Sequence, residues 1–295
     1  MGNHEVTTPQ MLLKEDGSLR EPGWSKRLVQ QYERSMIKAP KFRIKEWDYY
    51  LVLNEDFAGA FTLSDDGYIG LQSVSLLNFK EGWEHTETIL NPFPMGKFKL
   101  PNTSKEGDII YKDKRLHMAF QIRDGKRRIR CHFKNFYQGK TFSCDIWLEQ
   151  PDMDTMVIAT PFKEKKTAFY YNQKINCMPA SGKMKFDGKT YTFSKETDFG
   201  TLDWGRGVWT YDNCWYWGSG NTRIDGVPFG FNIGYGFGDT SAATENMLFY
   251  NGKAHKLDEV TFHIPEDSYL KPWKFTSNDG RFEMDFQPVL DRAAR

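Results

Sequence analysis

An acidic and a basic residue stand among aromatic residues in the second half of the sequence. Asp203 and Arg206 both lie within the segment 202–211, which reads LDWGRGVWTY. Burial raises the pKa of a carboxyl group and prepares it to act as a general acid, whereas an ion pair with Arg206 lowers the pKa and makes a structural contact. The sequence leaves both roles open. If the site is catalytic, we expect Asp203 to be the general acid, with Arg206 and Tyr216 tuning or orienting it.

Tryptophans are concentrated in the same region. Four of the nine tryptophans in the chain fall between positions 204 and 217, namely Trp204, Trp209, Trp215 and Trp217. Such rings line apolar pockets, and each attracts a developing positive charge by cation–π contact worth about 0.5–2 kcal/mol. In a strand, Trp215 and Trp217 share one face and Tyr216 takes the other. These residues predict a pocket for an apolar or polycyclic small molecule, where hydration, isomerisation or cyclisation would proceed without a cofactor.

A second polar segment follows a glycine-rich stretch at 234–246. We expect Tyr235, Asp239 and Glu245 from this segment to line the pocket, together with His117 from an alternating stretch earlier in the chain. The glycines do not match the G-x-G-x-x-G spacing of a dinucleotide-binding loop, so no phosphate site is expected. The six histidines lack zinc-ligand spacing, so no metal is expected either.

Charge and hydropathy exclude several classes of protein. The chain carries 40 Lys and Arg against 39 Asp and Glu, a net charge of +1, which argues against nucleic-acid binding and against a polybasic membrane-surface protein. The sequence contains no run of about 18 apolar residues, so no integral membrane association is expected. The N-terminus does not resemble a secretory signal, so we expect a cytoplasmic protein with four reduced cysteines. The oligomeric state is left open.

Turn-forming dipeptides indicate the fold class that must position these residues. Asp-Gly occurs six times and Asn-Gly once, mostly between segments that alternate with the period of a β-strand. A helix is expected only over residues 23–38, before Pro40. We therefore predict an all-β chain of two antiparallel barrels or strongly curved sheets in tandem. Residues 1–40 would form an extension with the short helix, residues 41–160 the first barrel and residues 161–295 the second.

Several blocks of sequence resemble one protein family. The chain is similar to the uncharacterised bacterial family DUF2804 over roughly residues 20–292. The resemblance rests on GWSKR at 23–27, KEWDYY at 45–50, DWGRG at 203–207, WGSG at 217–220, GFGD at 236–239 and DGRF at 279–282. Membership of this family does not imply any particular reaction.

A more distant resemblance is to the tandem lipocalin-like (calycin) proteins typified by carotenoid 1,2-hydratase, also called hydroxyneurosporene synthase. Fungal relatives of that fold include intramolecular cyclases. This resemblance implies that both barrels are lipocalin-like and that a carboxylic acid near tryptophans protonates an alkene. The motif of the hydratase has the form Asp-x-x-Trp-Gly, whereas Trp204 here follows Asp203 directly.

Two other functions fit the same residues. A non-catalytic carrier of lipophilic molecules would use the tryptophans to hold its ligand and an Asp203–Arg206 pair for structure. A carbohydrate-active enzyme would stack sugars on tryptophan and use two facing carboxylates in an open groove.

Overall fold

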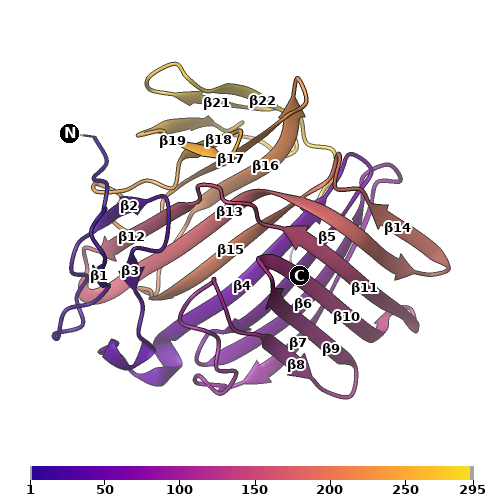
Figure 1. The fold of residues 1–295 in the computed structure, drawn as a ribbon, viewed down its shortest axis with the longest axis horizontal. Helices are drawn as coiled ribbons and strands as arrows, with labels where there is room; N and C mark the ends of the chain where they lie inside the picture. The colour runs from indigo at the N-terminus through magenta and orange to yellow at the C-terminus, as the bar shows by residue number, and fades with distance from the viewer. Residues whose placement is uncertain (1, 293–295) are drawn as a thin grey trace.

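The computed structural model describes residues 2–292 and consists almost entirely of β-strands (Figure 1). The prediction of an all-β chain is confirmed. The largest element is a 13-stranded sheet, called the main sheet below. Its strands follow the order β7 (Trp83–Pro92), β6 (Ile69–Asn78), β5 (Phe57–Asp65), β4 (Ile44–Leu53), β15 (Phe199–Val208), β13 (Lys165–Phe186), β11 (Lys140–Glu149), β10 (Lys126–Tyr137), β9 (Leu116–Arg123) and β8 (Ile109–Lys112). Three more strands join beside β13: β12 (Met156–Phe162), β14 (Lys189–Phe193) and, paired to β12, β2 (Gly23–Ser25).

The long strand β13 allows the main sheet to curl. Its first half pairs with β12 and its second half with β11 and β14, with a bulge between Ile175 and Met178. A bulge increases local twist and bends a strand. The curled sheet brings β7 close to the far edge, where Arg115 Nη2 donates to Glu87 at 2.8 Å and His85 Nε2 lies 2.9 Å from the carbonyl oxygen of Phe136.

The two faces of the main sheet have different partners because side chains alternate along a strand. Even-numbered residues of β4 and β15, such as Tyr50, Val52, Leu202 and Trp204, point into the curl and belong to the larger hydrophobic core. Odd-numbered residues such as Trp47 point to the outer face, toward a second core that includes Phe237, Met247 and Phe249. The candidate site lies on this outer face.

Two smaller sheets complete the fold beside the main sheet (Figure 1). One is four-stranded, with β16 (Tyr216–Ile224), β17 (Val227–Tyr235), β18 (Met247–Tyr250) and β19 (Lys253–Lys256) in sequence order. The other has three strands, β20 (Val260–His263), β21 (Trp273–Ser277) and β22 (Glu283–Phe286). Within residues 2–292, no helix is long and apolar enough to cross a membrane.

The expected helix over residues 23–38 is wrong. In its place are strand β2, strand β3 (Gln30–Gln31), which pairs in parallel with β1 (Gln10–Met11), and the short 3₁₀ helix η1 (Arg34–Met36). A second 3₁₀ turn, η2 (Lys41–Arg43), precedes β4. Trp24 pairs with Ile158 of β12, and its backbone also bonds to His4. Sheet pairing with distant residues here outweighs the weak helix propensity of the segment.

The division at residue 160 into two barrels stays a prediction. Strand pairing crosses that boundary, since β15 from the second range pairs with β4 from the first along the whole of Phe199–Val208.

Candidate active site

A cavity of about 430 Å³ lies on the outer face of the main sheet. Strands β4, β13 and β15 supply its floor, and β16 contributes to the opposite wall. Its aromatic lining consists of Trp47, Tyr49, Tyr170, Trp209, Trp215, Trp217 and Phe237. The size and the mostly apolar lining are typical of small-molecule sites.

Asp203 lies at the centre of the cavity floor. It stands directly between Tyr49 of β4 and Lys174 of β13 in the strand register. Lys174 Nζ is 2.8 Å from Asp203 Oδ2, and Asp203 Oδ1 accepts hydrogen bonds from Asn172 Nδ2 at 2.7 Å and Trp47 Nε1 at 3.3 Å. Both carboxylate oxygens of Asp203 therefore lie next to hydrogen-bond donors.

Glu245 is the second carboxyl group at the cavity. Its Oε2 atom lies 3.8 Å from Lys174 Nζ and has no hydrogen-bond partner among residues 2–292. Burial raises the pKa of Glu245; the positive charge of Lys174 opposes the rise, and the negative charge of Asp203 adds to it. The raised pKa means that Glu245 keeps its proton to a higher pH than a glutamic acid in water.

Lys174 connects the two carboxyl groups. Its side chain is only 2% exposed, and its ammonium group lies 4.6 Å from the ring centroid of Trp217. A buried lysine needs such partners, because an unpaired charge away from water is costly. Lys174, Asp203 and Glu245 form a charged group, called the triad below, inside an aromatic cavity.

The four-stranded sheet holds Glu245 in position. Asn232 of β17 donates from Nδ2 to the backbone oxygen of Glu245 at 2.7 Å and accepts from Trp217 Nε1 at 2.7 Å. Gly234 leaves room for the Glu245 side chain, since a Cβ atom at this position would come within 2.7 Å of Glu245 Cγ. Asn232 thus links an aromatic wall residue to the triad.

Gly205 gives Trp47 its place on the cavity floor. The two residues are register partners, and a Cβ atom on Gly205 would lie 1.9 Å from Trp47 Cζ2. The ring of Trp47 therefore lies over the backbone of β15, where it stacks on Tyr170 with an interplanar angle of 13°. From this position its indole nitrogen reaches Asp203.

We expect Gly205→Ala to displace Trp47 and to destabilise the fold by about 1–3 kcal/mol, because the added methyl group overpacks a filled site. Urea unfolding measures the loss, and tryptophan fluorescence reports the displaced ring. Gly218→Ala is the matched control, since its Cβ atom would meet only Ile233, at 3.3 Å. Equal stability of the two variants would contradict the close packing of Trp47 on Gly205.

The side of the cavity formed by β5, β6 and β7 is more polar. Four hydroxyl side chains line it: Thr62, Ser64, Ser73 and Thr88. Asp66 stands at its end and accepts a hydrogen bond from Ser64 Oγ at 2.9 Å. Burial raises the pKa of Asp66 to about 6, and Lys45 opposes that rise. A ligand in this cavity would meet aromatic faces on one side and hydrogen-bonding groups on the other.

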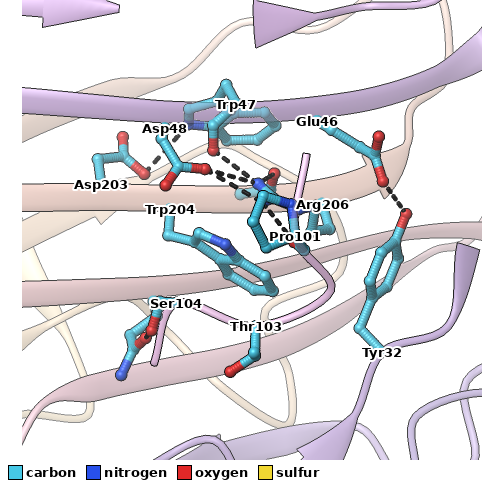
Figure 2. A network of polar contacts seen from close by, with 12 residues as sticks. Tyr32, Glu46, Trp47, Asp48, Pro101, Thr103, Ser104, Asp203, Trp204 and Arg206 are labelled. Carbon is cyan, nitrogen blue, oxygen red and sulfur yellow. Dashed lines mark hydrogen bonds and ion pairs between the residues drawn. The ribbon is translucent and has the colours of Figure 1, made fainter. Parts of the chain in front are cut away.

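The expected pair between Asp203 and Arg206 is wrong. Residues three apart on a strand point to opposite faces, so Arg206 enters the inner core, where both terminal nitrogens lie 3.1 Å from Asp48 Oδ1 (Figure 2). Arg206 Nη1 also donates to the backbone oxygen of Trp47 at 2.8 Å. Arg206 thus supports the strand that carries Trp47 and does not enter the cavity.

Trp204 also points to the inner face. It is fully buried and meets Tyr32 and Tyr171 edge to face, with its ring beneath the guanidinium group of Arg206 (Figure 2). Its expected role in shaping the pocket is therefore wrong, and it is a core residue.

The structure places four other expected residues outside the cavity. Tyr216 and Tyr235 stack on each other at 5.2 Å, and Tyr216 Oη lies 3.1 Å from Tyr269 Oη. Asp239 lines a separate hollow beside Cys214, and exposed His117 lies on β9 opposite His132. The expected residues that do meet at the cavity are Asp203, Trp209, Trp215, Trp217 and Glu245. Among residues 2–292, no group of three or more His, Cys, Asp or Glu is arranged to hold a metal ion.

Sequence reasoning missed Trp47, Tyr170 and Lys174. The sequence did contain one signal. Tyr170, Asn172 and Lys174 are two residues apart and share one face of strand β13, whereas the opposite face of this strand is almost wholly apolar. A lysine and an asparagine at such spacing in a buried strand indicate a polar site on one face. Trp47 and Tyr49 show the same two-residue spacing.

Comparisons with known proteins agree with this architecture. A family model described as Domain of unknown function (DUF2804) matches residues 3–295, which confirms the predicted resemblance. One similar solved structure is assigned as AttH from Nitrosomonas europaea, with a TM-score of 0.53, 15% identity, and coverage of 88% of this chain and 85% of that one. Another is kievitone hydratase from Nectria haematococca, with a TM-score of 0.51, 10% identity, and coverage of 96% and 86%. A search of curated proteins found no match. At these identities the likeness shows the fold.

Proposed function

We propose a function for this chain, which belongs to the DUF2804 family, from its cavity and triad. The protein binds a lipophilic or polycyclic small molecule and catalyses acid–base hydration, isomerisation or cyclisation of it without a cofactor. One observation carries this proposal: two carboxyl groups, one of which has its pKa raised by burial, share one buried lysine inside an aromatic cavity. The name of one structural neighbour, a hydratase, supports the reaction class.

In the proposed reaction, Glu245 donates its proton to one carbon of a carbon–carbon double bond. The adjacent carbon becomes electron-poor, and the faces of Trp215 and Trp217 stabilise the developing positive charge. The Glu245 carboxylate that remains lies near Lys174, whose charge favours it. Water, or a hydroxyl group of the ligand, then adds to the electron-poor carbon.

Asp203 completes the proton balance. It accepts the proton that the adding oxygen releases, and Lys174 passes a proton from Asp203 to Glu245 to restore the starting state. Lys174 is suited to this transfer by its contacts of 2.8 Å to Asp203 Oδ2 and 3.8 Å to Glu245 Oε2. In this assignment Glu245 takes the acid role that sequence reasoning gave to Asp203. Arg206 is a positioning residue.

The first experiment is native mass spectrometry and solvent extraction of protein purified from its own host, where we expect a cytoplasmic location. A co-purifying apolar molecule is expected, and Trp215→Ala and Trp217→Ala should each lose it. Trp273→Ala is the control, because Trp273 lies on β21 away from the cavity lining.

The outcomes separate the candidate functions. A ligand that is retained but never changed by the protein would favour a carrier. A ligand-free protein whose melting temperature rises with oligosaccharides, and not with polycyclic compounds, would overturn the proposal in favour of sugar chemistry.

A further inference from the structure

Exposed apolar side chains gather at the end of the main sheet where β4 begins and β15 ends. Phe42, Tyr68, Phe93 and Met95 come from three loops that are joined by backbone hydrogen bonds. Tyr68 N donates to the oxygen of Phe42 at 3.1 Å, and Phe93 N donates to the oxygen of Tyr68 at 2.9 Å. Tyr211, which is 83% exposed, joins them through Arg43, whose guanidinium group lies 3.7 Å from its ring centroid. We call these five apolar residues the rim.

The backbone holds the rim outward at a conformational cost. Phe93 and Met95 both have a φ of 49°, in the left-handed region that bulky residues rarely adopt. Asp65, which is fully buried, fixes this loop by accepting from Gly96 N at 2.8 Å. In this loop Phe93 stays 59% exposed. Strain kept in place by a buried carboxylate is typical of functional segments.

Positive charges lie beside three of these apolar side chains, Phe42, Phe93 and Met95. Residues 34–45 and 89–100 contain no Asp or Glu, yet they include Lys38, Lys41, Arg43, Lys97 and Lys99. The four lysines are exposed. Asp65 and Asp66 precede Tyr68, and Asp212 follows Tyr211, so the basic excess lies on the side of the rim formed by Phe42, Phe93 and Met95.

We propose that the rim docks on the surface of an anionic lipid bilayer. Phenylalanine, tyrosine and methionine on loop ends enter the boundary between headgroups and acyl chains, and basic residues beside them attract anionic headgroups. The rim side chains are exposed and lie on turns and loops at the end of the sheet, which suits insertion into a soft surface. This is peripheral binding, in which the rim side chains enter one face of the bilayer.

The rim lies close to one end of the cavity, with Lys45 between them. The ammonium group of Lys45 lies 4.1 Å from the ring centroid of Tyr68, a rim residue, and 5.9 Å from that of Trp209, a cavity residue. Lys45 Nζ also donates to the backbone oxygen of Asp66 at 2.8 Å. Docking at the rim would therefore bring this end of the cavity, where Asp66 lies, close to the bilayer from which a lipophilic ligand would enter. This route rests on the proposed function, whereas docking itself does not.

Co-sedimentation of the full chain with vesicles tests the docking. We expect binding to phosphatidylcholine vesicles that contain about one-third phosphatidylserine, and little binding to pure phosphatidylcholine. Phe93→Ser with Met95→Ser should weaken binding to the anionic vesicles about tenfold or more, because buried apolar area is lost. Lys41→Glu with Lys97→Glu should weaken it similarly and reduce its dependence on salt.

Matched controls lie at the other end of the molecule. Ile224→Ser removes an exposed apolar side chain on the β16–β17 hairpin, and Lys185→Glu reverses an exposed charge on β13; both should bind like the unaltered protein. Equal binding by rim and control variants would overturn the proposal. So would binding to single-stranded oligonucleotides in place of vesicles. Failure of the chemistry in the cavity would leave vesicle binding intact, so the two proposals fail separately.

Discussion

Glu245→Gln is expected to slow proton transfer to the bound ligand by about 10²–10⁴-fold, the usual contribution of a general acid. Glutamine keeps the size of the side chain and its place beside Gly234 but cannot donate an acidic proton. The ligand extracted from the protein, incubated with it in D₂O, would gain deuterium at carbon, and mass spectrometry measures the rate. Ligand affinity should change by less than about threefold, since the glutamine fills the same space.

The pH dependence gives a second readout of the same group. Glu245 acts in its protonated form, and burial raises its pKa above the ordinary value of 4.5. The rate should therefore fall as pH rises through this raised pKa. The residual rate of the glutamine variant should lack that fall, because glutamine does not titrate.

Asp239→Asn is the matched control for Glu245→Gln. Asp239 is an acidic residue of the same chain segment, but it lines the separate hollow beside Cys214. Its variant should incorporate deuterium at the normal rate. If Asp239→Asn slowed the reaction as much as Glu245→Gln, the acid role of Glu245 would have to be abandoned.

Lys174→Met is expected to cost about 3–5 kcal/mol of the free energy of unfolding, because it leaves the Asp203 carboxylate at the cavity floor without its cation. Methionine matches the length of the lysine stem, so packing changes little and charge is the main difference. Urea unfolding followed by circular dichroism measures this loss. The double variant Lys174→Met with Asp203→Asn should recover a large part of it, since the unpaired charge is gone.

An exposed ion pair provides the comparison for Lys174. Lys166 Nζ lies 2.7 Å from Asp16 Oδ2, but the lysine side chain is 76% exposed. Lys166→Met should cost no more than about 1 kcal/mol, because water screens a surface pair. A loss for Lys174→Met as small as this would show that the triad is not a strongly coupled buried group.

Much of the fold could be predicted from the local sequence. Asp-Gly at 124–125 and 187–188 predicts hairpins, and the structure has those hairpins between β9 and β10 and between β13 and β14, with Asp124 and Asp187 at positive φ. The failure over 23–38 has a physical cause. A three-residue strand such as β2 exists only because β12 offers it an edge, and that edge comes from residues more than a hundred positions away.

The candidate site could be predicted from the sequence only in part. The cluster of Trp209, Trp215 and Trp217 with Asp203 marked the correct region, and Glu245 was among the expected pocket residues. Alternation along β15 already implied that Asp203 and Arg206 face opposite ways, although the expected ion pair disregarded it. The cation that pairs with Asp203 is Lys174, which a strand register brings beside it from 29 residues earlier in the chain.

Local patterns in this chain were enough to specify strands, turns and an aromatic pocket-forming segment, because period and turn chemistry act between near neighbours. The raised pKa of Glu245 was decided by folding. Protonation depends on burial and on nearby charges, and the groups around Glu245 come from β13, β15 and β17, which meet only when the four-stranded sheet packs beside the curled main sheet.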